Sequence, residues 1–173
     1  NIVLNTASTA LSGTSSNYLN AFAGTVTSST GIFTITNSDY TISDLITINS
    51  KTSGDLILSD TTASLSGLVS DIKDAFAGTV TTHTGSITIT DAAATDITAT
   101  DISSINTSST GSITVTNAID INGSGSEVAA AFAAIDTNTG NATANITGSD
   151  YTIAQLKAIN NATGGAIVLV DPT

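Results

Sequence analysis

Short runs in which apolar residues alternate with threonine or serine recur along the chain. The clearest runs are GIFTITN (31–37), GDLILSD (54–60), GSITITD (85–91) and GSITVTN (111–117). Alternation with a period of two is the pattern of a strand with one buried face. The sequence therefore predicts short strands, each opened by a glycine. The runs TVTSST (25–30) and TVTTHT (79–84) repeat the alternation just before two of these glycines.

The segments between these runs place apolar residues three and four positions apart, as a helix does. In LSGLVSDIKDAF (65–76), this spacing predicts a helix with Ser66 as its N-cap. GSGSEVAAAFAAI (123–135) predicts a helix of about two turns that begins near Ser126. Single turns after a Ser or Thr cap are predicted in TISDLITIN (41–49) and TIAQLKAIN (152–160). We therefore expect short helical corners between the strands.

The chain contains internal repeats. Residues 1–37 align with residues 55–91 without a gap, and 17 of the 37 positions are identical. Residues 38–54 match residues 149–165, which share SDYTI and end in a glycine. A repeat of about 55 residues therefore fills the chain. The copies are 1–54, 55–110 and 111–164, and residues 165–173 open a fourth.

Each repeat divides again at the glycines that open the strands. These glycines are Gly31, Gly54, Gly85, Gly111, Gly140 and Gly165. Their mean separation of about 27 residues, with a strand in every interval, is typical of a solenoid. We therefore expect a single mainly-β domain over residues 1–173, a parallel β-solenoid of about six coils with short helical corners. Phe22, Phe76 and Phe132 share one repeat phase, and we interpret them as core.

The amino-acid composition argues against several classes of function. The chain has three lysines, no arginine and 14 acidic residues, for a formal charge of −11. So little positive charge argues against nucleic acid as a partner. No apolar stretch of about 18 residues exists, so no membrane span is expected. The chain begins at Asn1 with no methionine or leader, which suggests a processed protein or a segment of a longer one. Its Thr/Ser/Asn-rich, cysteine-free composition favours an extracellular, cell-surface location.

A family resemblance points the same way. Segments such as IAQLKAIN (153–160) alternate with strands such as TGSITVT (110–116). In this alternation the whole chain resembles the repeats of very large secreted bacterial surface or filament proteins, which are common in cyanobacteria and other marine bacteria. The resemblance implies a β-solenoid that serves as a stalk, an adhesin or an extracellular filament.

One column of polar residues is a candidate Ca²⁺ site. Asn37, Asp60, Asp91, Asn117 and Asp171 each stand six residues after a strand-opening glycine. Stacked oxygens of this kind are the ligands that Ca²⁺ prefers. The alternative is a structural ladder in which the side chains bond the turn backbone. Asp96 and Asp101 join Asp91 as further candidate ligands. The calcium-binding nonapeptide GGxGxDxUx is absent from the sequence.

The sequence gives weaker indications of ice binding and of catalysis. Thr-x-Thr pairs such as Thr34/Thr36 and Thr88/Thr90 are typical of an ice-binding face, or simply of outward-facing strand residues. The single histidine, His83, takes the place of Ser29 in the first repeat, and we interpret it as a surface variant. One histidine cannot form a zinc set or a catalytic triad. We therefore expect no enzyme.

Self-association is the leading expectation. The two ends of the chain share one phase of the repeat, and both carry apolar strand residues. These residues are Ile2, Val3 and Leu4 at one end, and Ile167, Val168 and Leu169 at the other. Unblocked strand edges pair with other chains. We expect a structural module that stacks head to tail on copies of itself or on covalently continuous repeats. The alternatives are a Ca²⁺-dependent glycan- or ice-binding module, and a phage or bacterial fibre shaft.

Overall fold

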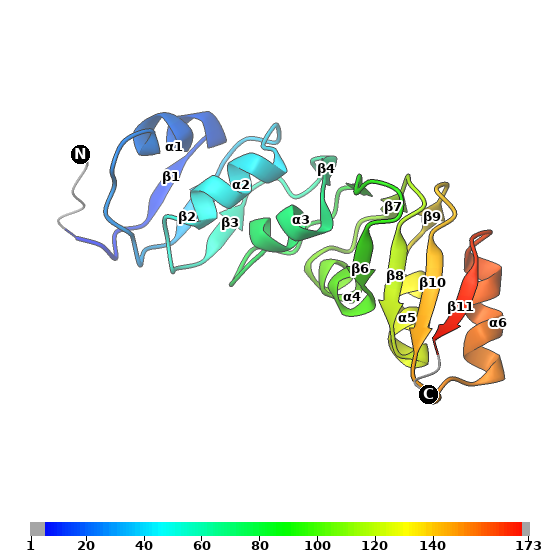
Figure 1. Cartoon of the computed structure of the whole chain (residues 1–173). Helices are drawn as coiled ribbons and strands as arrows, with labels where there is room; N and C mark the ends of the chain where they lie inside the picture. Colours follow the sequence, from blue (N-terminus) through cyan, green and yellow to red (C-terminus); the bar gives the residue numbers. More distant parts are fainter. Residues whose placement is uncertain (1–5, 171–173) are drawn as a thin grey trace.

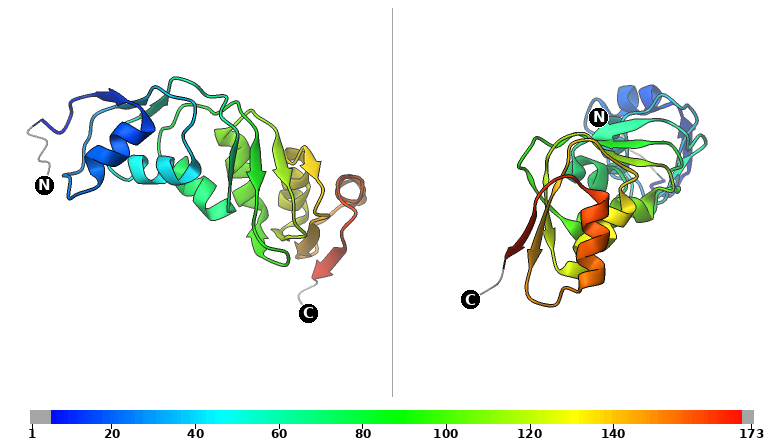
Figure 2. Two further views of the ribbon diagram at one scale, coloured as in Figure 1. Left: turned by 90° about the horizontal axis from the view of Figure 1, so that it is seen from above. Right: turned by 90° about the vertical axis from the view of Figure 1, so that its right-hand side faces the viewer.

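The computed structural model describes residues 6–170. They form an elongated, gently curved α/β structure in which one or two short strands precede each helix (Figures 1 and 2). The helices are α1 (Ser15–Phe22), α2 (Ile42–Asn49), α3 (Val69–Ala75), α4 (Ala99–Ser108), α5 (Gly125–Ala134) and α6 (Ile153–Ala162). The strands are β1 (Leu11–Gly13), β2 (Phe33–Ile35), β3 (Leu56–Leu58), β4 (Leu65–Gly67), β5 (Ile87–Ile89), β6 (Asp96–Thr98), β7 (Ile113–Val115), β8 (Asp120–Gly123), β9 (Thr137–Asn138), β10 (Thr143–Thr147) and β11 (Ile167–Val170).

The strands pair in parallel and fall into three sheets. The orders are β1-β2-β3, β4-β5-β7-β9 and β6-β8-β10-β11. In the first sheet, Leu11 pairs with Phe33 and Phe33 pairs with Leu56, so paired residues lie 22 and 23 positions apart. Each sheet crosses a boundary between repeats: β1 and β2 lie in residues 1–54 and pair on to β3 in residues 55–110, and β4 and β5 pair on to β7 and β9 in residues 111–164. Strand pairing therefore joins each repeat to the next.

The expected six-coil, mainly-β solenoid is wrong. Within the described residues the fold is mixed α/β, with six helices and three separate sheets of three or four strands. The helices are longer than corners because their caps and apolar faces support two or more turns. In α2, for example, the side chains of Thr41 and Asp44 form a reciprocal capping box. The helices α4, α5 and α6 each run for ten residues.

The strand positions, in contrast, are confirmed for the four clearest runs. The strands β2, β3, β5 and β7 each begin two residues after the predicted glycine. Their outer residues are buried and the middle one is not, as the alternation predicts. The core lies between these strands and the helices, and Phe22, Phe76 and Phe132 belong to it as expected.

The helix that begins LSGLVSDIKDAF starts later than predicted. The run LSG forms β4, which contains Ser66, and α3 begins at Val69 after Leu68, which makes no side-chain cap bond. The missing cap comes from the following turn of the chain, 22 residues on, because the carboxylate of Asp91 accepts from the N–H of Val69 at 2.8 Å. The prediction of Ser66 as the N-cap is therefore wrong.

A hydroxyl two residues before a strand-opening glycine ties one turn of the chain to the turn before it. Thr52 donates to the carbonyl of Gly31 at 2.7 Å and accepts from the N–H of Gly54 at 2.9 Å. The same pair of bonds is made by Ser29, Ser109 and Thr163. The runs TVTSST and TVTTHT lie in this region and form only isolated bridges, among them Ser29, Val80 and His83, so the strands predicted there are wrong. Side-chain bonding of this kind competes with a regular strand ladder.

Candidate functional site: the two ends of the helix stack

The helices stack in chain order, each against the next. The residue just before the N-cap of one helix lies on the first residue of the helix before it. A Cβ atom placed on Gly67, before α3, would lie 3.5 Å from the side chain of Ile42, the first residue of α2. Gly123, before α5, lies in the same way over Ala99, the first residue of α4, with a Cβ distance of 3.1 Å. The small residue lets the following turn approach closely.

This stacking buries the first residue of every helix except the last. The buried ones are Ser15, Ile42, Val69, Ala99 and Gly125. Ile153, the first residue of α6, is 85% exposed, whereas Ile42 is 5% exposed. Both isoleucines stand in the same sequence, SDYTI. The difference arises because α3 covers α2, while nothing in the described part of the chain stacks beyond α6.

Apolar side chains surround Ile153 and define what we call the C-terminal face. They come from α6 and from β11, which is the last strand of its sheet and pairs only with β10. A shallow hollow of about 410 Å³ is lined by Ile153, Leu156, Lys157, Asn160, Ile167 and Leu169. Val168, Leu169 and Val170 are each more than 40% exposed. Sequence analysis predicted the strand part of this face but missed Ile153.

A second hollow lies at the other end of the stack, on what we call the N-terminal face. It has a volume of about 190 Å³ and is lined by Leu11, Ser12, Gly13, Asn17, Tyr18, Ala21 and Phe22, from β1 and α1. Ala21 is exposed, whereas its counterpart Ala75, in the repeated sequence AFAG, is fully buried. The predicted residues Ile2, Val3 and Leu4 lie outside the described residues.

The two end helices differ from the others in charge. Helices α1 (SSNYLNAF) and α6 (IAQLKAINNA) contain no carboxylate, and α6 carries Lys157. Each of the four helices between them carries at least one acid. The net charge of the chain is −11, so two copies repel each other overall. The acid-free ends are the faces on which two copies meet with the least repulsion.

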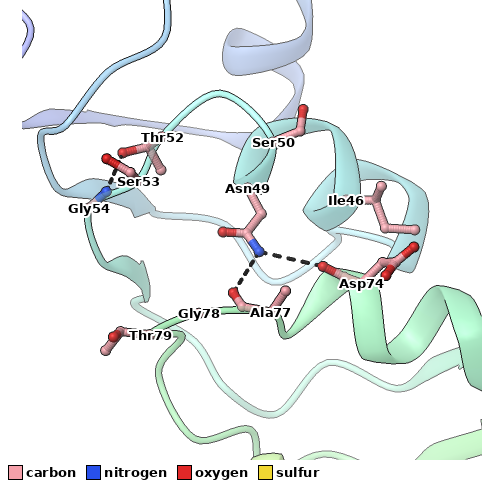
Figure 3. Close-up of a pocket in the computed structure, with 10 residues that line it drawn as sticks. All are labelled: Ile46, Asn49, Ser50, Thr52, Ser53, Gly54, Asp74, Ala77, Gly78 and Thr79. Atoms are coloured by element: carbon pink, nitrogen blue, oxygen red, sulfur yellow. Dashed lines mark hydrogen bonds between the residues drawn. The ribbon is translucent and has the colours of Figure 1, made fainter.

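A further hollow lies on the side of the stack (Figure 3). It is a groove of about 430 Å³ between the ends of α2 and α3 and the turns that follow them. Asn49 crosses it and donates from Nδ2 to the carbonyl of Ala77 at 2.9 Å. Its only charged lining residue is Asp74. One carboxylate among hydroxyl and backbone groups offers no catalytic pair, and the Asn49 amide is already used in joining the two helices.

The candidate Ca²⁺ ligands are spread over the structure. Asp91 caps α3, as described above, and Asp60 accepts from the N–H and the hydroxyl of Thr62. These two bonds from Thr62 hold the pKa of Asp60 below its usual value. Asn37 is a cap like Asp91, since its Oδ1 accepts from the N–H of Ser15 at 2.7 Å. The column therefore bonds turn and helix backbone, which was the structural alternative.

The other two described candidates have different partners. Asp96 accepts from the amide of Asn122 at 3.0 Å, and Asp101 pairs with Lys73 at 2.5 Å. Asp171 lies outside the described residues. Among residues 6–170 no three His, Asp or Glu side chains gather in a way that holds a metal ion. Calcium binding stays a prediction.

His83 is not the surface variant that the sequence suggested. It is fully buried, and its ring packs against Phe76 with the centroids 5.7 Å apart. Its Nε2 lies 2.9 Å from the carbonyl of Ala63, which can only accept, so Nε2 carries the proton. Burial lowers the pKa of His83, and the bond to Ala63 opposes this in part. The histidine therefore replaces Ser29 as a link between turns of the chain.

Comparison with models of protein families, with curated proteins and with solved structures found no match to this chain. Within the described range no helix is both long and apolar enough to cross a bilayer. The site is therefore defined by its own geometry: two apolar, acid-free faces at opposite ends of a stack of repeats (Figures 1 and 2).

Proposed function

We propose that the protein is a structural module that stacks end to end within an extracellular filament, stalk or adhesin. The observation that carries the proposal is the exposure of Ile153, at a position that is buried in every preceding helix. An isoleucine exposed to this extent loses the stabilisation of about 1.5–3 kcal/mol that its burial gives. A following repeat, either from another copy or along a longer chain, recovers it.

Three further features support this function. The repeats place equivalent apolar positions at both ends of the chain. The N-terminal end therefore resembles the surface that covers the counterpart of the C-terminal end inside the chain. Contact between unlike ends is head to tail and does not close, so it produces a fibre. The end helices lack acids in a chain that is otherwise strongly acidic. The extracellular location in this proposal is supported by composition.

The test is the state of association of the 173-residue chain. We expect sedimentation velocity to show species that grow with protein concentration, and electron microscopy to show rods or filaments. Higher salt is expected to promote growth because it screens the net charge. A monomer of constant size at every protein and salt concentration overturns stacking between separate copies, which is the form of the proposal that this experiment tests. A parallel series with a calcium chelator tests the predicted Ca²⁺ dependence, which is present only if chelation shortens the assemblies.

A further inference from the structure

We infer that the partner of the C-terminal face is the N-terminal face of a second copy, docked as α3 and β4 dock on α2 inside the chain. In this junction, β1 and α1 of the second copy cover α6 of the first. The inference rests on the proposed stacking function and adds its partner surface and its register. The chain already contains the template for this contact.

Both sides of the template recur at the ends in related sequence, with 10 of 17 positions identical on the covered side and 17 of 37 on the covering side. The covered side, residues 38–54, recurs 111 positions later as residues 149–165, which include α6. The covering side, residues 55–91, recurs 54 positions earlier as residues 1–37, which include β1 and α1. Two surfaces that are in contact within the chain are thus also displayed, uncovered, at its opposite ends (Figure 1).

The first contact of the junction joins Ile153 and Gly13. Its template is Ile42 against Gly67, where the Cβ position of the glycine lies 3.5 Å from both Ile42 Cγ atoms. Gly13 precedes the N-cap of α1 as Gly67 precedes that of α3, in the same LSG sequence. Stacking therefore buries Ile153 under a residue with no side chain to obstruct it.

The second contact joins Asn160 and Ala23. In the template, Asn49 donates from Nδ2 to the carbonyl of Ala77, just after α3 (Figure 3). Asn160 is the counterpart of Asn49 and is exposed, and Ala23 is the counterpart of Ala77 in the repeated AFAG. The junction thus repeats one apolar contact and one hydrogen bond, about two helical turns apart.

The residues that differ between the template and the two ends of the chain favour contact between separate acidic copies. Asp71, Lys73 and Asp74 of α3 correspond to Asn17, Leu19 and Asn20 of α1, so the covering helix loses two carboxylates and one cation. Ile46 of α2 corresponds to Lys157 of α6. Removal of carboxylates from one side and addition of a cation to the other both lower the repulsion between copies.

The register also defines which residues of the second copy lie outside the junction. Residues 1–7 share the repeat phase of the segment that begins at Ala166, and β11 already occupies that position in the first copy. The second copy therefore joins through β1 and α1. Deletion of residues 1–5 is expected to leave the junction intact, and its loss on this deletion would overturn the assignment to β1 and α1.

Cysteine pairs test the register in a chain that has no cysteine of its own. The internal control is I42C/G67C, because the Cβ position at Gly67 lies 3.7 Å from Ile42 Cβ, within the range for a disulfide. The test variant is G13C/I153C, which is expected to form covalent ladders of dimers, trimers and longer species on non-reducing gels under mild oxidation. The off-register control is G24C/I153C, since the Cβ position of Gly24 faces open space and Gly24 follows Ala23, at the Asn160 end of the junction, about two helical turns from Ile153.

The outcomes separate the inference from the function on which it rests. If the wild-type chain assembles and I42C/G67C closes, but G13C/I153C forms no more ladder than G24C/I153C, the register is wrong and the stacking function stands. If the wild-type chain does not assemble, both fail. In addition, I153D is expected to weaken association about tenfold or more, whereas L68D, which changes an exposed leucine in mid-chain, is expected to leave it unchanged. Equal association of the two variants overturns the inference.

Discussion

The substitution of Gly111 by alanine gives the most direct test of how closely successive turns of the chain pack. A Cβ atom on Gly111 would lie 1.8 Å from the carbonyl oxygen of Gly85 and 2.8 Å from that of Thr84. Both are backbone atoms of the turn below, so neither can rotate away. To reach even the 3.0 Å limit of real contacts, the two turns have to separate by about 1.2 Å. Neighbouring strands lie only about 4.8 Å apart, so β5 and β7 cannot stay paired through such a shift.

We therefore expect G111A to lower the free energy of unfolding by about 3 kcal/mol or more. That is a large part of the 5–15 kcal/mol typical of a domain. The matched control is G24A, at a glycine with no atom within 4 Å of its Cβ position. It is expected to leave stability unchanged or raise it by up to about 1 kcal/mol. The assay is urea unfolding followed by circular dichroism, and equal midpoints for the two variants refute the close packing described here.

The remaining predictions concern buried polar groups. Since burial lowers the pKa of His83 from its ordinary 6.5, the unfolded chain binds more protons below about pH 6.5, and stability falls as the pH is lowered. H83S, which restores the residue found at position 29, is expected to lose less stability than the wild type between about pH 7.5 and 5.5 in urea titrations; an equal loss contradicts the buried neutral imidazole. Tyr40 donates to the carbonyl of Asp60 at 2.6 Å, and burial, together with the Asp60 carboxylate, raises its pKa to about 12. Y40F is expected to cost about 1 kcal/mol in thermal or urea unfolding, and an unchanged midpoint contradicts this reasoning.

The strands could be located from the sequence because their signal is local. Each glycine at the start of a run is needed where one turn of the chain crosses another at close range, as at Gly111, and the alternation after it reports which face is buried. Neither feature depends on the rest of the fold. The phenylalanine column was predicted for the same reason, because repeat phase alone places Phe22, Phe76 and Phe132 at equivalent positions in the core.

The share of helix and the division into three sheets could not be predicted in this way. Helix length depends on caps, and two of the decisive caps come from the following turn of the chain: Asn37 caps α1 and Asp91 caps α3, each across 22 residues. The same residues were weighed as calcium ligands, because a column of oxygens has one sequence pattern for both roles. His83 was misplaced because its burial depends on contacts with Ala63 and Ser109, which lie 20 and 26 residues away.

The candidate site was predicted only in part. The apolar residues of β11 and their shared phase with the start of the chain led to the prediction of association at this end, which stays a prediction. Ile153 was missed because its local sequence does not distinguish it from a core residue. The same sequence, SDYTI, contains Ile42, which is buried in the core. Only comparison of the two repeats in the folded structure shows that Ile42 is covered and Ile153 is not.

The parallel pairing of strands also determines how the molecule responds to tension. Hydrogen bonds between strands run across them, and therefore along the length of the stack from β1 toward β11 (Figure 1). A pull on the two ends loads successive strand pairs in series, so they peel apart one at a time. Each pair that opens releases the chain between its partners, 23 residues for Phe33 and Leu56, or about 80 Å of extended polypeptide. We therefore expect the described stack to lengthen in steps under tension and to shorten again as neighbouring turns re-pair.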